Sequence, residues 1–418
     1  MALRAVAPAT GRLNARGAPA GGVTDRRAWT LLVGGAGAYG ALLFAWFSLA
    51  AYLPTVTADL GLSGTGAGLL AGAVPLTYVP VSLVSGPLVD RFGPYRSIGA
   101  GVLVVGVAHV GRSAATAFPA MLAATVLLGV GGTAITFGLP KLVSEQFPAG
   151  EAGPPSTVYL LGSVSGTAAS FTLGRGVLGP AAGGWRPLFA ATGVACVVYG
   201  GLWAGLVVAL GPERPADGGD ADVASVRRVL RAVLSNPGMR LLLVVGVVYL
   251  GVVHGVQNWL ATVLEARGVA ATTAAASTGV FVAAQAGGTL VLPALSDCLG
   301  RRGGVVAGCG LACALGVGAL AVPSAPLALA LGGAVAAGVG AGGLSPLVRM
   351  VPAELDGVGA ERTGAAVGVV FAAGELGGFG APVLVGALHD ATGSYAAGFG
   401  LLAAGALWAV VAGRRLPV

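Results

Sequence analysis

Charged residues are scarce in this chain of 418 residues. They make up 9% of the sequence, against roughly 25% in typical globular domains. So few charges cannot cover a water-soluble surface of this size, while 56% of the residues are hydrophobic. The 74 glycines follow no collagen-like period, and small residues are common where membrane helices pack closely. The composition therefore excludes an ordinary soluble protein and predicts a bundle of helices in a lipid bilayer.

Residues that bind metals or carry covalent catalysis are also few. The chain has three histidines and four cysteines, and no cysteine stands at a metal-ligand spacing from a histidine. The sequence contains no H-E-x-x-H, no G-x-S-x-G and no pair of acids within one apolar run. We therefore expect no metal, no cofactor other than a proton or ion gradient, and no enzyme. A non-transporting sensor remains an alternative function, although no signalling domain is visible in the sequence.

Lysine is nearly absent from the sequence. The net charge of +7 results from 22 arginines and one lysine against 16 acids. The basic residues fall between apolar runs and form no single patch, so nucleic acid is not an expected partner. Residues 1–28 contain five arginines and no apolar core of a signal peptide. We interpret them as a cytoplasmic tail, and residues 414–418 as a second one.

Twelve runs are long and apolar enough to cross a bilayer, which takes about 20 residues. We place them near residues 29–53, 65–89, 97–115, 118–140, 155–177, 187–210, 240–263, 272–294, 303–323, 327–349, 364–388 and 394–413.

The basic residues predict the orientation of these spans. With the N-terminus inside, the inner segments hold 19 of the 23 Arg and Lys residues. The outer segments hold the other four, which are Arg112, Arg175, Arg186 and Arg267. Cytoplasmic loops carry such an excess, so we expect both termini in the cytoplasm and a location in the cytoplasmic membrane.

The longest polar stretch lies in the middle of the chain, at residues 211–239. Its first half is rich in Pro, Gly and Asp, and its second half places Val and Leu at helical spacing opposite three arginines. This pattern predicts a cytoplasmic linker with an amphipathic helix at the membrane surface. The linker separates an N-terminal six-helix bundle, residues 29–210, from a C-terminal one, residues 240–413.

The two bundles resemble each other in sequence at a fixed offset of 207 residues. The stretch "YLPTVTADLGLSGTGA" (52–67) matches "WLATVLEARGVAATTA" (259–274) at six positions. The same offset aligns Leu88, Asp90 and Gly93 with Leu295, Asp297 and Gly300. The chain is therefore interpreted as a duplication, and transporters built from such repeats hold their solute where the repeats meet.

The repeated charges resemble a known loop motif. "GPLVDRFGPYR" resembles the G-x-L-a-D-r-x-G-r-r loop of the major facilitator superfamily, and the second copy keeps part of it. The span count, central linker and repeat extend the resemblance over nearly the whole chain. The residues that carry the motif are Gly86, Asp90, Arg91, Gly93 and Arg96, then Asp297, Gly300, Arg301 and Arg302.

This resemblance implies a fold, a function and a gate. The fold is all-α, with twelve transmembrane helices in two pseudo-symmetric bundles that rock about a central cleft. In the family, the motif's Asp contacts a helix start in the other half and stabilises the outward-facing state. That role falls on Asp90 and, less directly, on Asp297. The basic residue that relays protons in many members is missing, because Thr125 stands at its place.

Glu375 is the only acid within the apolar core of a predicted span. A charged side chain there costs about 2.5–3.5 kcal/mol on insertion scales, so Glu375 is a candidate for carrying a coupling proton or facing the solute. The alternative is a protonated carboxyl group bonded to a neighbouring helix.

Polar and aromatic residues in spans one and seven are candidates for the solute cavity. "HGVQNW" supplies His254, Gln257, Asn258 and Trp259, while the first span supplies Tyr39 and Trp46. Polar groups in lipid should face protein or water; interhelical hydrogen bonding is the alternative role. Lys141 and Glu145 share a helix face, which predicts a gate or a surface ion pair.

These features predict a secondary transporter of a small polar or anionic organic solute that works by alternating access, with proton coupling, as a monomer in the lipid bilayer. "PKLVSEQFP" and "NWLATVLEARG" resemble the branch that handles cyanate and other small organic anions. The alternative is a proton-driven exporter of drugs or metabolites, which the partial fifth-span motif "GPAAGG" favours.

Overall fold

The computed structural model describes residues 26–148, 150–210, 231, 233–355, 358 and 360–418, and the described chain is helical without strands. The predicted linker at 211–239 and the tail at 1–28 lie almost wholly outside these residues. Eleven helices of the described chain are long and apolar enough to cross a membrane. The remaining predicted span, 155–177, is made of α6 (Gly153–Ala169) continued by the π-helix η1 (Ser170–Leu178).

The N-terminal half contains the helices that precede the linker. Their bounds are α1 (Arg26–Ala51), α2 (Leu53–Asp59), α3 (Gly64–Phe92), α4 (Pro94–Ala114), α5 (Phe118–Gln146), α6, η1, α7 (Gly179–Ala182) and α8 (Trp185–Leu210). The C-terminal half contains α10 (Pro237–Ala266), α11 (Ala271–Leu299), α12 (Arg302–Ala321), α13 (Leu327–Glu354), α14 (Ala360–Thr392) and α15 (Tyr395–Arg415).

Local sequence explains where several helices begin and end. Ser63 caps α3 by accepting a hydrogen bond from the Gly66 N–H at 3.1 Å, and Asn236 caps α10 in the same way. Gly93 ends α3 with a φ of +81°, a conformation that glycine adopts without strain. Pro94 then opens α4, where its missing N–H costs nothing.

The two halves repeat one packing pattern. In the N-terminal half α4 packs against α5 and α8, α3 against α5, and α1 against α6. In the C-terminal half α12 packs against α13 and α15, α11 against α13, and α10 against α14. These are the same contacts under the 207-residue repeat, so the fold is two pseudo-symmetric six-helix bundles, as the sequence predicts.

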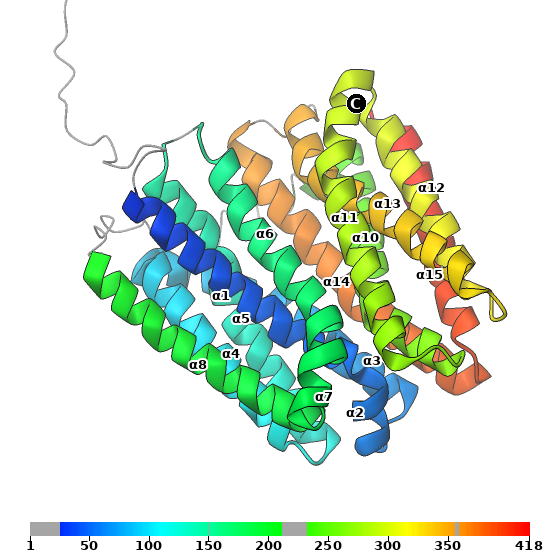
Figure 1. The fold of residues 1–418 in the computed structure, drawn as a ribbon. Coiled ribbons are helices and arrows are strands. Elements are labelled where there is room, and N and C mark those ends of the chain that lie inside the picture. The colour runs from blue at the N-terminus through cyan, green and yellow to red at the C-terminus, as the bar shows by residue number, and fades with distance from the viewer. Residues whose placement is uncertain (1–25, 149, 211–230, 232, 356–357, 359) are drawn as a thin grey trace, which may run out of the picture.

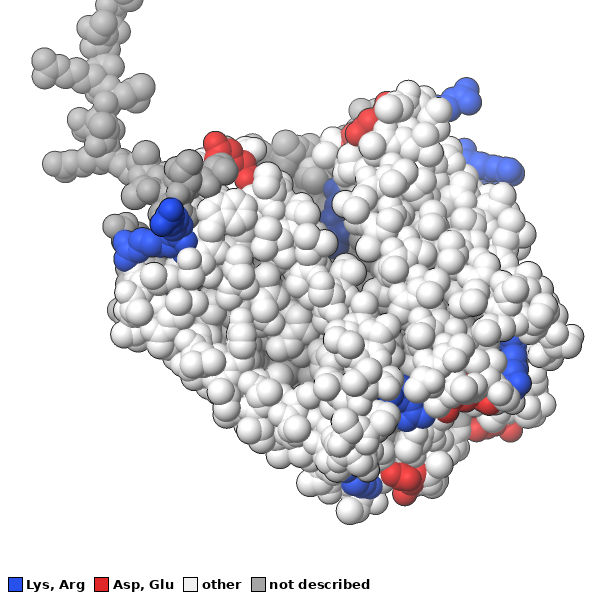
Figure 2. All heavy atoms as spheres, viewed as in Figure 1, with Lys and Arg blue, Asp and Glu red and all other residues white. Residues whose placement is uncertain are grey.

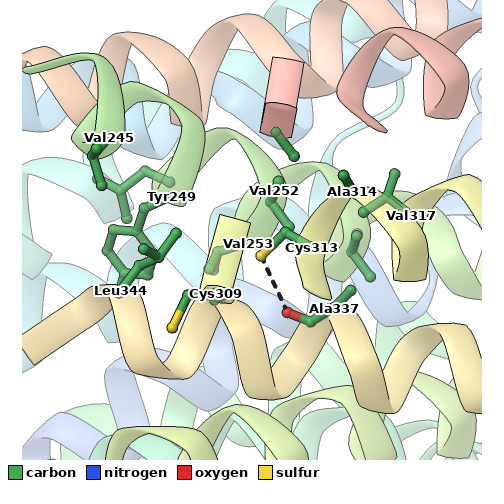
Figure 3. Close-up of a cluster of buried hydrophobic side chains, with 14 of the residues drawn as sticks. Val245, Tyr249, Val252, Val253, Cys309, Cys313, Ala314, Val317, Ala337 and Leu344 are labelled. Atoms are coloured by element: carbon green, nitrogen blue, oxygen red, sulfur yellow. Dashed lines mark hydrogen bonds between the residues drawn. The ribbon is translucent and has the colours of Figure 1, made fainter. Parts of the chain in front are cut away.

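Each half has its own apolar core. Figure 3 shows part of the C-terminal one, where Val245 and Tyr249 of α10 lie near Leu344 of α13. The thiol of Cys313 on α12 donates a hydrogen bond to the Ala337 carbonyl, with sulfur and oxygen 3.7 Å apart. The three cysteines in apolar runs are buried and unbonded to one another, as small hydrophobic residues are.

The chain crosses the bundle an even number of times. Helix α1 begins at the same end at which the C-terminus lies, and this end is called the terminal end below (Figure 1). The turns between α1 and α3, and between α14 and α15, lie at the other end, which is called the opposite end. Charged side chains gather near these ends on the face in Figure 2, with a mostly uncharged surface between them.

Candidate functional site

Aromatic residues of both halves meet in the middle of the protein. The Trp46 ring on α1 stacks on the His254 ring on α10, with centroids 5.6 Å apart and planes at 15°. Phe47 lies 6.2 Å from the same imidazole, and Tyr78 of α3 lies 5.6 Å from Trp46. We call Trp46, Phe47, Tyr78 and His254 the ring cluster. The cluster joins the halves, because three of its members belong to the N-terminal one.

Glu375 lies beside this cluster, on α14. A Cβ atom built on Gly378 would lie 2.8 Å from His254 Cδ2 and 3.3 Å from Glu375 Oε2. It would also lie 3.3 Å from Cβ of Pro75 on α3. The carboxyl group and the imidazole therefore approach the same short stretch of α14, at the seam between the two halves.

Three buried polar atoms around the seam have no hydrogen-bond partner among the described residues. They are Trp46 Nε1, His254 Nδ1 and Glu375 Oε2. Trp46 is 8% exposed and His254 is 5% exposed, so bulk water does not satisfy them. Buried polar groups in proteins nearly always have a partner. This cluster of unused donors and acceptors is thus suited to a bound solute.

The remaining candidates of the seventh span lie apart from the ring cluster or bond within the C-terminal half. Gln257 donates to Gln285 of α11 at 3.2 Å, and Asn258 donates to the His254 carbonyl at 2.8 Å. Trp259 donates to the Pro382 carbonyl at 3.0 Å and packs near Tyr395. Contact of these three side chains with solute stays a prediction. The bonds of Gln257 and Trp259 fit the interhelical alternative, whereas that of Asn258 lies within α10.

A second layer of aromatic side chains lies nearer the terminal end. Tyr39 is seven residues before Trp46 on α1, about 10 Å along the helix axis. Its ring lies 6.2 Å from that of Tyr159 on α6. In the other half, Tyr249 of α10 lies 6.5 Å from Phe371 of α14. Tyr39 therefore lines the same central region, between the ring cluster and the terminal end.

Arg349 of α13 accompanies this layer. The guanidinium carbon lies 4.4 Å from the centroid of the Phe371 ring, and Arg349 interacts electrostatically with Tyr39 of the other half. Nη1 donates to the Ser345 carbonyl at 2.8 Å and to the Ser345 hydroxyl at 2.7 Å. At the end of a span, Arg349 had the sequence signature of a topology signal.

The first copy of the charged motif lies at the terminal end. Asp90 forms an ion pair with Lys141 of α5, with Nζ and Oδ1 2.9 Å apart. Both residues line an open groove of about 320 Å³ between α3 and α5, to which Gly86 also contributes. Arg91 lies near the Phe92 ring, and Arg96 is exposed on α4.

The second copy also forms its ion pairs within its own half, the C-terminal one. Asp297 pairs with Arg302 at 2.8 Å, and Arg302 also bonds Glu354 of α13. Gly300 ends α11 with a φ of +58°, and the exposed Arg301 precedes α12. Among the described residues, neither Asp90 nor Asp297 pairs with the other half.

The predicted ion pair of Lys141 with Glu145 is absent among the described residues, and Arg112 is more deeply buried than its sequence position predicts. Lys141 pairs with Asp90, whereas both carboxylate oxygens of Glu145 are buried without a partner. Arg112, which was counted with the outer segments, lies in the last turn of α4 and is fully buried. It donates to the Thr125 hydroxyl at 3.1 Å and to the Ala45 carbonyl at 2.9 Å. Since Ala45 precedes Trp46, this cation supports the helix that carries the ring cluster.

The halves are fastened together at the opposite end. Asp390 of α14 accepts hydrogen bonds from the N–H groups of Gly64 and Thr65, each at 2.7 Å. It accepts a third from the Thr65 hydroxyl at 2.6 Å. We call this contact the latch. A carboxylate at a helix N-terminus is favourable because the first N–H groups there have no partner within the helix.

Further contacts extend this seal toward the ring cluster. A Cβ atom on Gly68 of α3 would come within 2.5 Å of the Pro382 carbonyl, and one on Gly72 within 2.7 Å of the Phe379 carbonyl. The backbones of α3 and α14 are therefore in close contact. Arg175 of η1 pairs with Glu265 of α10 at 3.4 Å, which adds an ion pair between the halves.

At the terminal end, the interface between the two halves is open, in contrast to the closed opposite end. Figure 2 shows a hollow between the two halves there, with Lys or Arg atoms visible inside it. Apart from the electrostatic interaction of Arg349 with Tyr39, the contacts between halves that are described above lie at the ring cluster or closer to the opposite end. The described molecule therefore has a central cleft that opens toward the terminal end and is closed toward the opposite end.

A multi-pass membrane protein with two repeated six-helix bundles around such a cleft has the architecture of a solute transporter. The comparisons with known proteins agree with this architecture. The sequence profile described as "Major Facilitator Superfamily" matches residues 35–382. This match covers most of the chain, so the chain belongs to the major facilitator superfamily and is a transporter rather than an enzyme.

Two bacterial relatives cover most of the chain. The 3-(3-hydroxy-phenyl)propionate transporter of Escherichia coli (strain K12) is 30% identical over 83% of this chain and 82% of its own length. The probable nitrate/nitrite transporter NarK2 of Mycobacterium tuberculosis (strain CDC 1551 / Oshkosh) is 30% identical over 87% and 90%.

Solved structures share the fold at lower identity. A bacterial homologue of the human lysosomal transporter Spinster, in an inward-facing and unoccupied conformation, superimposes with a TM-score of 0.77 at 17% identity. That match covers 94% of this chain and 96% of the other. A point mutant of the nucleoside transporter NupG gives a TM-score of 0.72 at 13% identity over 94% and 100%.

Proposed function

We propose that the chain is a secondary active transporter that moves a small polar or anionic organic solute by alternating access. The observation that supports this proposal is the one-sided closure of the cleft. Asp390 and the close backbones of α3 and α14 seal the opposite end, while the terminal end is hollow. Such an asymmetry is expected of one of the two states between which a rocking transporter alternates.

We propose that the terminal end is cytoplasmic and that the protein acts as a monomer in the cell membrane. The excess of Arg and Lys in the segments at that end supports this orientation. A monomer is sufficient, because one chain supplies both walls of the cleft. In this orientation, the described state is open to the cytoplasm.

The charged motif and the latch are proposed to be alternative fasteners. In the described state Asp90 and Asp297 pair within their own halves, at 2.9 Å and 2.8 Å. The resemblance assigns to Asp90 a contact with a helix start of the other half in the outward-facing state. Asp390 makes a contact of the same chemistry at the opposite end. Closure of one end would therefore accompany release of the other.

Glu375 is proposed to carry the coupling proton. Its carboxyl group lies at the seam beside His254, where its buried Oε2 has no partner among the described residues. A carboxylate without a counter-ion is unfavourable in such a place, so the group favours its protonated form until the cleft admits water or an ion. Protonation and the state of the cleft would thereby depend on each other.

Transport by the purified protein tests the proposal. Proteoliposomes would be loaded at one pH and diluted into buffer of the same or a different pH, with 3-(3-hydroxyphenyl)propionate or nitrate outside. We expect accumulation of a solute above its outside concentration when a pH gradient is imposed, and only equilibration without one. Equal accumulation with and without the gradient contradicts proton coupling, and no movement of any tested organic anion contradicts the proposed function.

A further inference from the structure

Arg349 is a cation at the central cleft whose charge is not neutralised by the described residues. No carboxylate of the described chain lies within 4.0 Å of it, whereas Lys141 and Arg175 each have one and Arg302 has two. Its side chain is nevertheless held in place. Ser345 accepts two hydrogen bonds from Nη1, and the guanidinium lies over the Phe371 ring at 4.4 Å.

The space beside this guanidinium is bordered by rings of both halves. Arg349 interacts electrostatically with Tyr39, which in turn interacts with Tyr159 and Tyr249. The Tyr159 ring comes from α6, and the Tyr249 ring of α10 lies 6.5 Å from the Phe371 ring that the cation covers, so rings of both halves accompany the cation. The Nε and Nη2 donors of Arg349 make no described hydrogen bond.

The ring cluster closes this space on the side of the opposite end. Trp46 follows Tyr39 by seven residues on α1, and Glu375 follows Phe371 by four on α14, which amounts to about 10 Å and 6 Å along their axes. Trp46 Nε1, His254 Nδ1 and Glu375 Oε2 are buried and unpartnered there. The cleft thus has a fixed cation at one level and unused donors and acceptors one layer deeper, with aromatic walls between.

We propose that this cleft binds an aromatic monocarboxylate, with the carboxylate on Arg349, the ring between the aromatic walls, and a ring substituent at the ring cluster. A guanidinium binds a carboxylate through two parallel hydrogen bonds, and flat apolar bodies pack favourably on aromatic faces. Nitrate matches the cation but is too small to reach the deeper polar atoms as well. This inference rests on the proposed transport function and adds the class of solute and its principal ligand.

Binding measurements on the purified full chain test this assignment. The probes are 3-(3-hydroxyphenyl)propionate, its carboxamide and nitrate, with quenching of tryptophan fluorescence as the readout because Trp46 lies at the ring cluster. The variants are Arg349→Gln and Arg349→Lys. The matched control is Arg415→Gln, an exposed arginine at the end of α15. Gel filtration and thermal unfolding show that each variant is folded.

We expect the wild type to bind the acid and to bind the amide at least about tenfold more weakly, since a charge-assisted pair is lost. Arg349→Gln should weaken binding of the acid by a similar factor and leave binding of the amide unchanged. Arg349→Lys should give an intermediate affinity, because an ammonium lacks the planar pair of donors. Arg415→Gln should match the wild type.

Three results would overturn the inference. The first is equal affinity of Arg349→Gln and wild type for the acid, the second is tighter binding of nitrate than of the acid, and the third is binding of none of the probes. Proteoliposome uptake separates this inference from the proposed function. If the acid binds through Arg349 but does not cross the membrane, the ligand assignment stands and the transport proposal fails.

Discussion

Among single residues, the most informative arrangement is the approach of Glu375 to His254 beside Gly378. Both side chains present a buried atom without a described partner, and both lie where α14 meets α3. A charge at this point would be exposed to little water in the described state. The protonation state of Glu375 is therefore expected to influence whether the halves can stay closed around it.

Glu375→Gln is expected to abolish the pH dependence of transport. Glutamine mimics the protonated carboxyl group in size and hydrogen bonding but cannot release a proton. Uptake into proteoliposomes from pH 5 to 8 should become flat, with equilibration of solute but no accumulation on a pH gradient. Glu151→Gln serves as control, because Glu151 is exposed near the start of α6. An unchanged pH profile in Glu375→Gln would remove this residue from the mechanism.

Sequence patterns identified some of these residues and missed others for a physical reason. Glu375, His254 and Trp46 stand out because acids, imidazoles and indoles are rare in apolar spans. Arg349 and Asp390 do not stand out, because charges near span ends are also expected as topology signals. Buried Arg112 was placed in an outer segment on the same ground. Charge position along the sequence does not reveal which helix face a side chain occupies.

Among helices, the contact between α3 and α14 is made largely by backbone. Gly64, Gly68 and Gly72 follow one another at four-residue spacing on α3, so they share one face. A Cβ atom on each would meet atoms of α14 within 2.7 Å. This close approach needs no interlocking side chains, which allows the two helices to separate and meet again without repacking a core.

Gly68→Ala is expected to weaken closure of the opposite end. Its added methyl group would come within 2.5 Å of the Pro382 carbonyl and 2.8 Å of Val383 Cα, and backbone atoms cannot yield as a side chain does. Overpacking of this kind costs about 1–3 kcal/mol. Thermal unfolding in detergent should therefore begin at a lower temperature, and uptake should slow.

Gly205→Ala is the matched control for this change, because a Cβ atom on Gly205 of α8 meets nothing within 4 Å. A variant Gly68→Ala that unfolds and transports like Gly205→Ala would show that the two helices do not need to touch.

The positions of the helices along the sequence were predictable, whereas the rotation of each helix about its own axis was not. Eleven predicted spans correspond to single described helices that are long and apolar enough to cross a membrane, and the twelfth, 155–177, corresponds to α6 with η1. In these spans the faces toward lipid and toward protein are both apolar, so periodicity cannot tell which face is buried. The contact of Gly64, Gly68 and Gly72 with α14 is therefore known only from the structure. The same is true of the π-helix at Ser170–Leu178.

For the whole molecule, the decisive property is the free-energy balance between two states, one closed at the opposite end and one closed at the terminal end. The latch is one contribution to that balance, and the ion pair between Arg175 and Glu265 is another. A net loss of about 1.4 kcal/mol on one side changes the ratio of the two states about tenfold. One hydrogen bond contributes about this much, so a single substitution can shift the population measurably.

Asp390→Asn is expected to open the opposite end. The amide keeps one acceptor oxygen but loses the charge, so at least one of the bonds to Gly64 and Thr65 is lost. Distances between spin labels at Ala58→Cys and Ala391→Cys should lengthen in a larger fraction of molecules than in the labelled parent. Labels at Ser144→Cys and Ala353→Cys, at the terminal end, should show the reverse trend.

The labelling background is Cys298→Ser, since Cys298 is exposed while Cys196, Cys309 and Cys313 are buried. Unaltered distance distributions at both ends would contradict the assignment of the latch as a determinant of the balance between states.

The latch also constrains how this protein can change in evolution. Two of its three donors are main-chain N–H groups, of Gly64 and Thr65. Replacing side chains along α3 leaves those donors in place, unless a proline removes one. The side-chain part of the latch can therefore be tuned chiefly from one position, 390. Descendants that need faster turnover would be expected to vary there, while Gly64, Gly68 and Gly72 stay small because α14 lies close to them.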